Sequence, residues 1–155
     1  AQLLNEHPWM FVIVGQGGGK ARLEKMVSVR GLTNVKFFPL QSYEALPALL
    51  KMGDFHLVVQ KRGAADAVLP SKLTNILAVG GNAVITAEAE TELGQLCDSY
   101  PGIAVCVEPE SVPALVTGIE QALAMPKVNT VAREYAERTL EKENVLSQFI
   151  ADIRG

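Results

Sequence analysis

The stretch that decides the fold is FVIVGQGGGKARLEKMVSVRGLTNVKFF, residues 11–38. It begins and ends with short apolar runs, 11–14 and 35–38, which are rich in β-branched or aromatic residues and do not alternate with polar ones. Such continuous runs are typical of strands in a parallel sheet that helices cover on both faces. A glycine-rich turn and an amphipathic helical pattern lie between them. The stretch therefore predicts two parallel strands joined by a helix.

The same alternation of strand and helix continues along the chain. Three further apolar runs, 56–60, 83–86 and 103–107, predict strands, and after Pro126 the pattern changes to two helices. We therefore predict an α/β fold: a doubly wound, mostly parallel, Rossmann-like sheet of about five strands, with helices on both faces and two C-terminal helices. The predicted apolar helix faces contain Leu23, Met26 and Val27; Tyr43, Leu46 and Leu50; Leu73, Ile76 and Leu77; Leu93 and Leu96; and Val112, Leu115, Val116, Ile119, Ala122 and Leu123, with Ser111 as N-cap.

Length and composition narrow the class of protein. A chain of 155 residues is close to the most common domain size, so a single domain over 1–155 is expected. With 48% apolar and 20% charged residues the chain is not disordered, and a net charge of −3 without a basic stripe argues against nucleic acid as a partner. It has two cysteines and no apolar run that could cross a bilayer. A reduced, cytoplasmic protein is expected.

The first loop that follows a predicted strand is the glycine turn, residues 15–20. Its glycines let the backbone approach a ligand closely, and the next helix offers N–H groups to an anion. A Walker loop would need glycine at Val14 and Ser or Thr at Ala21. A dinucleotide fingerprint would need glycine at Lys20 and an acidic residue near Phe38. An anion site and a tight turn without a ligand both fit this pattern.

The loop after the third predicted strand carries Lys61 and Arg62, and the next helix opens with Pro70, Ser71 and Lys72. Ligands of open α/β sheets bind at the carboxyl ends of the strands, where both segments are expected. Three cations beside a helix N-terminus suit a diphosphate. A solvated loop with incidental charges also fits.

Other polar residues give weaker signals. Asn75, one turn further along that helix, can hydrogen-bond a ligand hydroxyl. Glu92 either reaches a sugar hydroxyl or begins a solvated helix within an acidic cluster. His56, inside a strand, is predicted to be a structural side chain with satisfied hydrogen bonds. Cys97 and Cys106 are predicted to be small core residues, because their spacing is not that of a metal or redox pair.

Several motifs resemble a known family in their order and spacing. They are FVIVGQG at 11–17, VKFFPL at 35–40, LPALL at 46–50, GD at 53–54, LPSKL at 69–73 and LAVGGNAVI at 77–85. The chain is similar over nearly its whole length to the C-terminal, nucleotide-sugar-binding domain of retaining glycosyltransferases of the two-Rossmann-domain (GT-B) type, family 4. From Gly15 to Pro109 it resembles members from bacterial colanic acid exopolysaccharide clusters. This implies a hexosyl transferase with GDP-fucose as the favoured donor.

The resemblance also implies roles for single residues. In such enzymes the donor's diphosphate is held by basic side chains and by the helix that here begins at Ser71. The matching cations are Lys61, Arg62 and Lys72, and the first two are the implied catalytic groups that stabilise the leaving group. The other implied substrate-binding residues are Gly15 and Gly17 beside the phosphates, Phe38, Pro39 and Leu40 near the base, Asn75 at the ribose, and Glu92.

Departures from the family pattern lead to further expectations. The glutamate that touches the transferred sugar is replaced by Ala67, so Asp66 is the implied third catalytic residue, and Asn75 replaces the ribose-binding glutamate. Family members place a further strand, a basic loop and an acceptor-binding N-terminal domain before these residues. The chain is therefore expected to be a fragment that is inactive alone. Its exposed strand edge is expected either to close by pairing of the first and third strands or to form a dimer.

The implied partners are a nucleoside diphosphate sugar and a lipid-linked saccharide acceptor, the latter bound through the N-terminal domain, with peripheral association at the cytoplasmic face of the inner membrane. No metal or cofactor is implied, because cations and a helix N-terminus neutralise the leaving group. Three alternative functions stay open. They are one half of a nucleotide-sugar epimerase, a nicotinamide dinucleotide-binding domain and a non-catalytic interaction domain.

Overall fold

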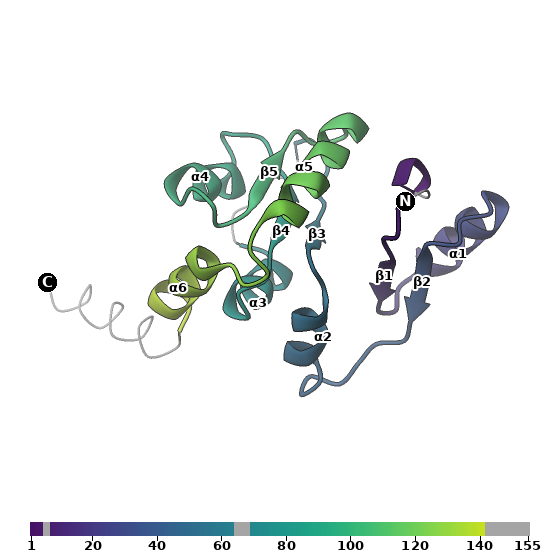
Figure 1. Ribbon diagram of the computed structural model, residues 1–155, viewed down its shortest axis with the longest axis horizontal. Coiled ribbons are helices and arrows are strands. Elements are labelled where there is room, and N and C mark those ends of the chain that lie inside the picture. The colour runs from purple at the N-terminus through teal and green to yellow at the C-terminus, as the bar shows by residue number, and fades with distance from the viewer. Residues whose placement is uncertain (5–6, 64–68, 142–155) are drawn as a thin grey trace, which may run out of the picture. The chain divides into compact units, whose positions relative to one another are not determined.

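The computed structural model describes residues 1–4, 7–63 and 69–141. Within them, five strands alternate with helices, and every strand pair is parallel, which confirms the α/β fold (Figure 1). The chain divides into two compact units, Ala1–Leu46 and Pro47–Gly155. The prediction of a single domain over the whole chain stays a prediction.

The strands form two hydrogen-bonded sheets, one of two strands and one of three. The first pairs β1 (Phe11–Val14) with β2 (Val35–Phe38), in the register Phe11 to Val35. The second has the order β3 (His56–Val58), β4 (Ala83–Thr86), β5 (Val105–Val107). Each described strand pair lies within one of the two units, so the expected pairing of β1 with β3 or a dimer contact stays a prediction.

The helices of the second unit follow the predicted positions closely. They are α2 (Leu46–Met52, whose first residue closes the first unit), α3 (Ser71–Ala78), α4 (Glu92–Ser99), α5 (Val112–Ala124) and α6 (Thr130–Thr139). Ser111 caps α5 as predicted, because its hydroxyl accepts a hydrogen bond from the Ala114 N–H at 3.3 Å. The second C-terminal helix, predicted around Val145 to Ile153, lies outside the described residues.

The core of the second unit lies on both faces of β4. Ala83 and Ile85 point to one face, where they join a buried cluster with residues of α3, α4 and α6. Val84 points to the other face, toward α5. A Cβ at Gly118 of α5 would lie 3.1 Å from Val84 Cγ1 and 2.6 Å from Val107 Cγ1, so only glycine lets α5 pack this closely. The prediction that helices pack on both faces is confirmed for the three-stranded sheet.

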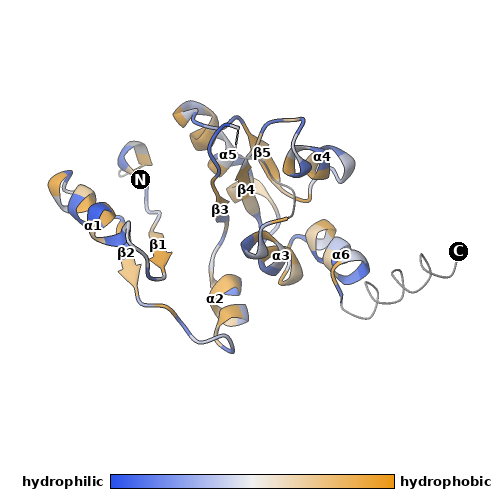
Figure 2. Ribbon diagram, turned by 180° about the vertical axis from the view of Figure 1, so that it is seen from behind, coloured by the Kyte–Doolittle hydropathy of each residue, from blue (hydrophilic) through white to orange (hydrophobic). Residues whose placement is uncertain are grey.

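The first unit buries much less. Among its described residues only Leu4, Asn34 and Val35 are buried. In β1, Val12 and Ile13 are exposed, although β1 and β2 show the same hydrophobic colour as β5 in Figure 2. The helix α1 (Lys20–Val29) forms as predicted, but none of its residues is buried. The apolar periodicity shows that the helix is amphipathic, but burial also needs a surface packed on that face.

Candidate functional site

The end of β3 is fixed to β4 just before the two predicted cations. The hydroxyl of Thr86 accepts from the Gln60 N–H at 2.7 Å and donates to the Gln60 carbonyl at 2.8 Å. Thr86 itself is buried, at 3% exposure. Lys61 and Arg62 therefore leave a rigid strand end at the carboxyl edge of the sheet, where ligands of such sheets bind.

Arg62 lies where all three strands of the second sheet end. Its guanidinium forms ion pairs with Glu108 at 2.7 Å and Glu88 at 3.4 Å, and Glu88 also accepts from the Gly63 N–H at 3.0 Å. Glu108 directly follows β5, and Glu88 follows β4 by two residues. The hydrogen bond from Arg62 to Glu108, with the charge of both carboxylates, raises the arginine pKa. Arg62 with Glu88 and Glu108 is called the Arg62 cluster below.

The sequence did not identify Glu88 or Glu108 as partners of Arg62. The signal that could have found them is that each is an acidic residue just after a strand. Because the strands are parallel, their carboxyl ends meet at one edge, where Arg62 was already expected.

Lys72, in the first turn of α3, points back to the sheet. The backbone N–H of His56 in β3 donates to the carbonyl of Asn82, which lies just before β4, at 2.8 Å. Because neighbouring residues of a parallel strand direct their peptide groups to opposite edges, the Leu57 carbonyl faces the edge of β3 away from β4. The Lys72 ammonium donates to that carbonyl at 2.5 Å. This ammonium therefore occupies the edge of β3 at which pairing with β1 was expected, and partial burial lowers its pKa.

The other predicted site residues of the second unit differ in how exposed they are. Ser71 is exposed at the start of α3, where no side chain caps the helix, and Asn75 is half-buried one turn later. Lys61 is exposed, and no ion pair of it is found within residues 1–4, 7–63 and 69–141. Glu92 is the exposed first residue of α4, consistent with a solvated helix start. Asp66 lies outside the described residues.

The glycine turn of the first unit lies beside the predicted base-binding loop. The Gly15 N–H donates to the Phe38 carbonyl at 3.2 Å, and Gly15 has a φ of 144°, which favours glycine. A Cβ at Gly17 would meet nothing within 4 Å, as at the next two glycines, so open space lies over the N-terminus of α1. Phe38 and Leu40 are exposed, and the Pro39 carbonyl accepts from Gln41 at 2.9 Å. Anion and base binding at this turn stay predictions.

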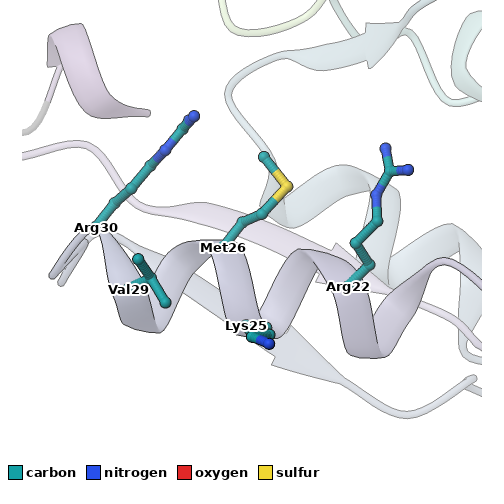
Figure 3. Close-up of a pocket in the computed structure, with 5 residues that line it drawn as sticks. All are labelled: Arg22, Lys25, Met26, Val29 and Arg30. Carbon is teal, nitrogen blue, oxygen red and sulfur yellow. The ribbon is translucent and has the colours of Figure 1, made fainter.

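A shallow hollow on α1 is lined by none of the predicted site residues. Figure 3 shows its lining, with Arg22 and Arg30 extending to the same side as Met26. Lys25 and Val29 of the same helix also line the hollow, which is formed by successive turns of this one exposed helix.

The structure also decides the predictions for the histidine and the cysteines. His56 Nε2 hydrogen-bonds the Leu50 carbonyl at 3.0 Å, and burial lowers its pKa, so the predicted structural role is confirmed. The prediction of a core position is wrong for Cys106, which is exposed and whose sulfur lies 3.9 Å from the Ala87 carbonyl oxygen.

No helix among the described residues is both long and apolar enough to cross a membrane. In the same part of the chain, no group of three or more His, Cys, Asp or Glu side chains is arranged to hold a metal ion.

Comparison with known proteins gives consistent matches. The family model "Glycosyl transferases group 1" matches residues 1–139. The chain is 81% identical, over all 155 of its residues, to "Putative colanic acid biosynthesis glycosyl transferase WcaI" of Escherichia coli K12, and it spans 38% of that protein. Two solved structures share the fold. A sucrose-phosphate synthase from Thermosynechococcus elongatus has a TM-score of 0.75 at 18% identity, covering 99% of this chain and 40% of its own. A glycosyltransferase from Rickettsia africae has a TM-score of 0.74 at 13% identity, covering 97% and 40%.

Proposed function

The chain belongs to the group 1 glycosyl transferases, and from this premise we propose that it is the nucleotide-sugar-binding part of a longer hexosyl glycosyltransferase of colanic acid biosynthesis. The longer enzyme would transfer a sugar from a nucleoside diphosphate, with GDP-fucose as the favoured donor. The family match over residues 1–139 and the 81% identity to a protein with that pathway in its name support this proposal.

The observation that carries the proposal is the Arg62 cluster. A guanidinium binds the paired oxygens of carboxylates and phosphates with the same fork of donors. In the free protein these donors bind Glu88 and Glu108. We assign the donor's diphosphate to this place, where its oxygens take over one or both carboxylate contacts of Arg62. Lys61, next to Arg62, adds a second positive charge.

The first turn of α3 supplies the other half of the proposed diphosphate site. Its N-terminus carries N–H groups without side-chain caps, and the helix dipole favours an anion there. Lys72 is long enough to exchange the Leu57 carbonyl for a phosphate oxygen. Asn75, one turn further along, is the proposed hydrogen-bond partner of the ribose. An amide makes a weaker bond there than the glutamate common in the family.

The chemical role of these groups follows from where charge develops. As the glycosidic bond breaks, negative charge grows on the departing diphosphate. Fixed cations and helix N–H groups then stabilise the transition state more than the ground state. Arg62 and Lys61 are the proposed catalytic groups of this kind, with Lys72 beside them. The proposed transfer retains the configuration of the sugar, and Asp66 is the proposed contact to it.

The acceptor and the rest of the enzyme are proposed from the family. The chain spans 38% of its Escherichia coli relative, so other parts of such an enzyme are available to bind a lipid-linked saccharide. On this proposal the enzyme works at the cytoplasmic face of the inner membrane, and residues 1–155 alone do not transfer sugar. Both β1 and β3 have a described pairing partner on one edge only, which leaves room for a further strand or for a dimer contact.

Calorimetric titration of the 155-residue chain with GDP, UDP and reduced nicotinamide dinucleotide, side by side, tests the proposal. We expect GDP to bind most tightly and the dinucleotide not to bind. Arg133→Ala is the matched control for Arg62→Ala, because Arg133 forms an exposed ion pair with Glu137 at 2.8 Å on α6. Binding of the dinucleotide alone, or equal losses in both arginine variants, would contradict the proposal.

A further inference from the structure

The first unit carries a basic, exposed helix that the proposed diphosphate site does not use. The helix α1 and its C-cap Arg30 hold four basic residues and one acidic residue, in a chain whose net charge is −3. One of the four, Lys20, pairs with Glu24 at 3.8 Å. Arg22, Lys25 and Arg30 are exposed and form no ion pair with any described residue. These three positive charges are therefore available to an anionic partner.

Apolar side chains lie between the three cations. Val29 is 77% exposed and Met26 37%. Both line the shallow hollow together with the cations, and Figure 3 shows Arg22 and Arg30 extending to the same side as Met26. These three residues are spaced by four positions, so they follow one another along one side of the helix. The surface formed by Arg22, Lys25, Met26, Val29 and Arg30 is called the α1 basic surface below.

The combination of charge, apolar side chains and size narrows the class of partner. Three cations are fewer than the roughly six to ten phosphate contacts of a typical nucleic-acid-binding protein, and α1 has no aromatic side chain on which a base could stack. A helix of ten residues is about 15 Å long, so it offers far less area than the roughly 800 Å² per partner of a stable protein interface. An anionic bilayer presents many phosphates beside hydrocarbon, and each Lys or Arg near it adds to the affinity. The observations favour a membrane surface.

We propose that the α1 basic surface binds the anionic phospholipids of a membrane surface. The three cations lie at the lipid phosphates, and Val29 and Met26 enter the headgroup layer, where their apolar surface leaves water. The inference rests on the proposed function for the membrane location, to which it adds a contact surface. It does not depend on the diphosphate site, because the α1 basic surface belongs to the first unit and the Arg62 cluster to the second.

Sedimentation of the 155-residue chain with phospholipid vesicles tests the proposal. We expect binding to vesicles of equal parts phosphatidylcholine and phosphatidylglycerol, and little binding to phosphatidylcholine alone. Sodium chloride should weaken the binding, because salt screens exposed charges. Inorganic phosphate at the same ionic strength should weaken it no more than sodium chloride does. Equal binding to both kinds of vesicle, binding to neither, or specific displacement by phosphate would overturn the proposal.

Removal of the three cations in one variant, Arg22→Gln with Lys25→Gln and Arg30→Gln, locates the contact. The vesicle affinity should fall roughly 100-fold, because each basic side chain near an anionic bilayer contributes about fivefold. The matched control removes the same charge from exposed positions of the second unit, by Lys51→Gln, Lys127→Gln and Arg138→Gln. Its affinity should change much less. Equal losses in the two variants would show that net charge alone governs binding and would overturn the proposal.

Val29→Ser tests the apolar part of the contact. Its vesicle affinity should fall several-fold with all cations in place, because an exposed apolar side chain no longer enters the headgroup layer. Soluble polyglutamate serves as a mimic of an acidic protein and should compete only weakly with the vesicles. Unchanged affinity in Val29→Ser together with full competition by polyglutamate would mean that α1 binds an acidic protein and would overturn the proposal. Far-UV circular dichroism checks the fold of every variant.

Nucleotide binding separates this surface from the donor site. GDP affinity, measured by calorimetry, should be the same in the triple variant of α1 as in the wild type. Vesicle affinity should be the same in Arg62→Ala as in the wild type. If GDP fails to bind while vesicles still bind, the diphosphate site fails and the membrane surface stands. Loss of vesicle binding in Arg62→Ala would move the contact to the second unit and overturn the inference.

Discussion

The two compact units of the chain differ in how much of their apolar sequence is buried. In Pro47–Gly155, helices pack on both faces of β4, and Leu73 and Ile85 have no exposed surface. In Ala1–Leu46, Val12 is 52% exposed and Met26 37%. Both units show the same pattern of short apolar strands and amphipathic helices. The difference shows that the spacing of apolar residues indicates which side chains are suited to burial. Whether they are buried depends on another element packing on that face.

The units also differ in what they offer a ligand. The first has a glycine turn with open space over a helix N-terminus. The second has an arginine held by two carboxylates at the point where three strands end, with Lys72 on the neighbouring helix. We propose that the donor's diphosphate binds in the second unit. Changes in stability, in nucleotide affinity and in pH dependence should therefore differ between the two units.

The largest expected effect is on stability. Leu73→Ala removes a fully buried side chain of α3 and should lower the free energy of unfolding by about 3 kcal/mol. Leu23→Ala on α1, where the side chain is 41% exposed, should change it by less than about 0.5 kcal/mol. Urea denaturation followed by circular dichroism measures both. Equal losses would mean that Leu23 is as well packed as Leu73, and the contrast between the units would fail.

The next largest effect is on nucleotide affinity. Arg62→Ala and Lys72→Ala should each weaken GDP binding roughly 10- to 100-fold, because each removes a charged hydrogen-bond donor of the proposed diphosphate site. Gly17→Ala should cause a smaller loss, since a Cβ there meets no atom within 4 Å. Calorimetry on the three variants ranks the two units directly. A larger loss in Gly17→Ala than in Arg62→Ala would move the diphosphate site to the first unit.

A smaller effect of opposite sign is expected at Glu108. Glu108→Gln removes the carboxylate closest to Arg62 and leaves Glu88 in place, so the diphosphate meets less competition. GDP affinity should rise by about two- to fivefold, since the ion pair is exposed and weak. Glu137→Gln, which removes the acidic partner of Arg133, is the matched control. Weaker binding in Glu108→Gln would mean that Glu108 orients Arg62 for the ligand instead of competing with it.

The smallest effect is the pH dependence of stability at His56. Burial lowers its pKa below the ordinary value of 6.5, so the unfolded chain binds a proton more readily than the folded chain. The contribution of the neutral side chain is complete above pH 6.5 and is lost as the pH falls from 6.5 to the folded-state pKa. His56→Asn should therefore flatten the pH profile of the unfolding midpoint across this range. An unchanged profile would show that another group titrates there.

Much of the second unit could be predicted from the sequence, because its patterns and its packing agree. Leu73, Ile76 and Leu77 were predicted on one helix face and are all fully buried. The helix α1 was also predicted, but none of its residues is buried, and nothing in residues 20–29 specifies a surface that would cover its apolar face.

The candidate site was predictable in its position but not in its contacts. Lys61 and Arg62 could be assigned to the carboxyl edge of the sheet because parallel strands all end there. Glu108 is 46 residues from Arg62 in the sequence, so no local pattern connects them. The hydrogen bond from Lys72 to the Leu57 carbonyl likewise depends on how α3 packs on β3.

Binding of the donor's diphosphate in the second unit is tested most directly by mapping GDP binding on the whole chain through amide chemical shifts in nuclear magnetic resonance. If the diphosphate binds there, the largest shifts will fall at Gly63 beside the Arg62 cluster and at Ser71, Lys72 and Leu73 in the first turn of α3. Shifts confined to the glycine turn at residues 15–20, with the α3 amides unchanged at saturating GDP, would contradict it.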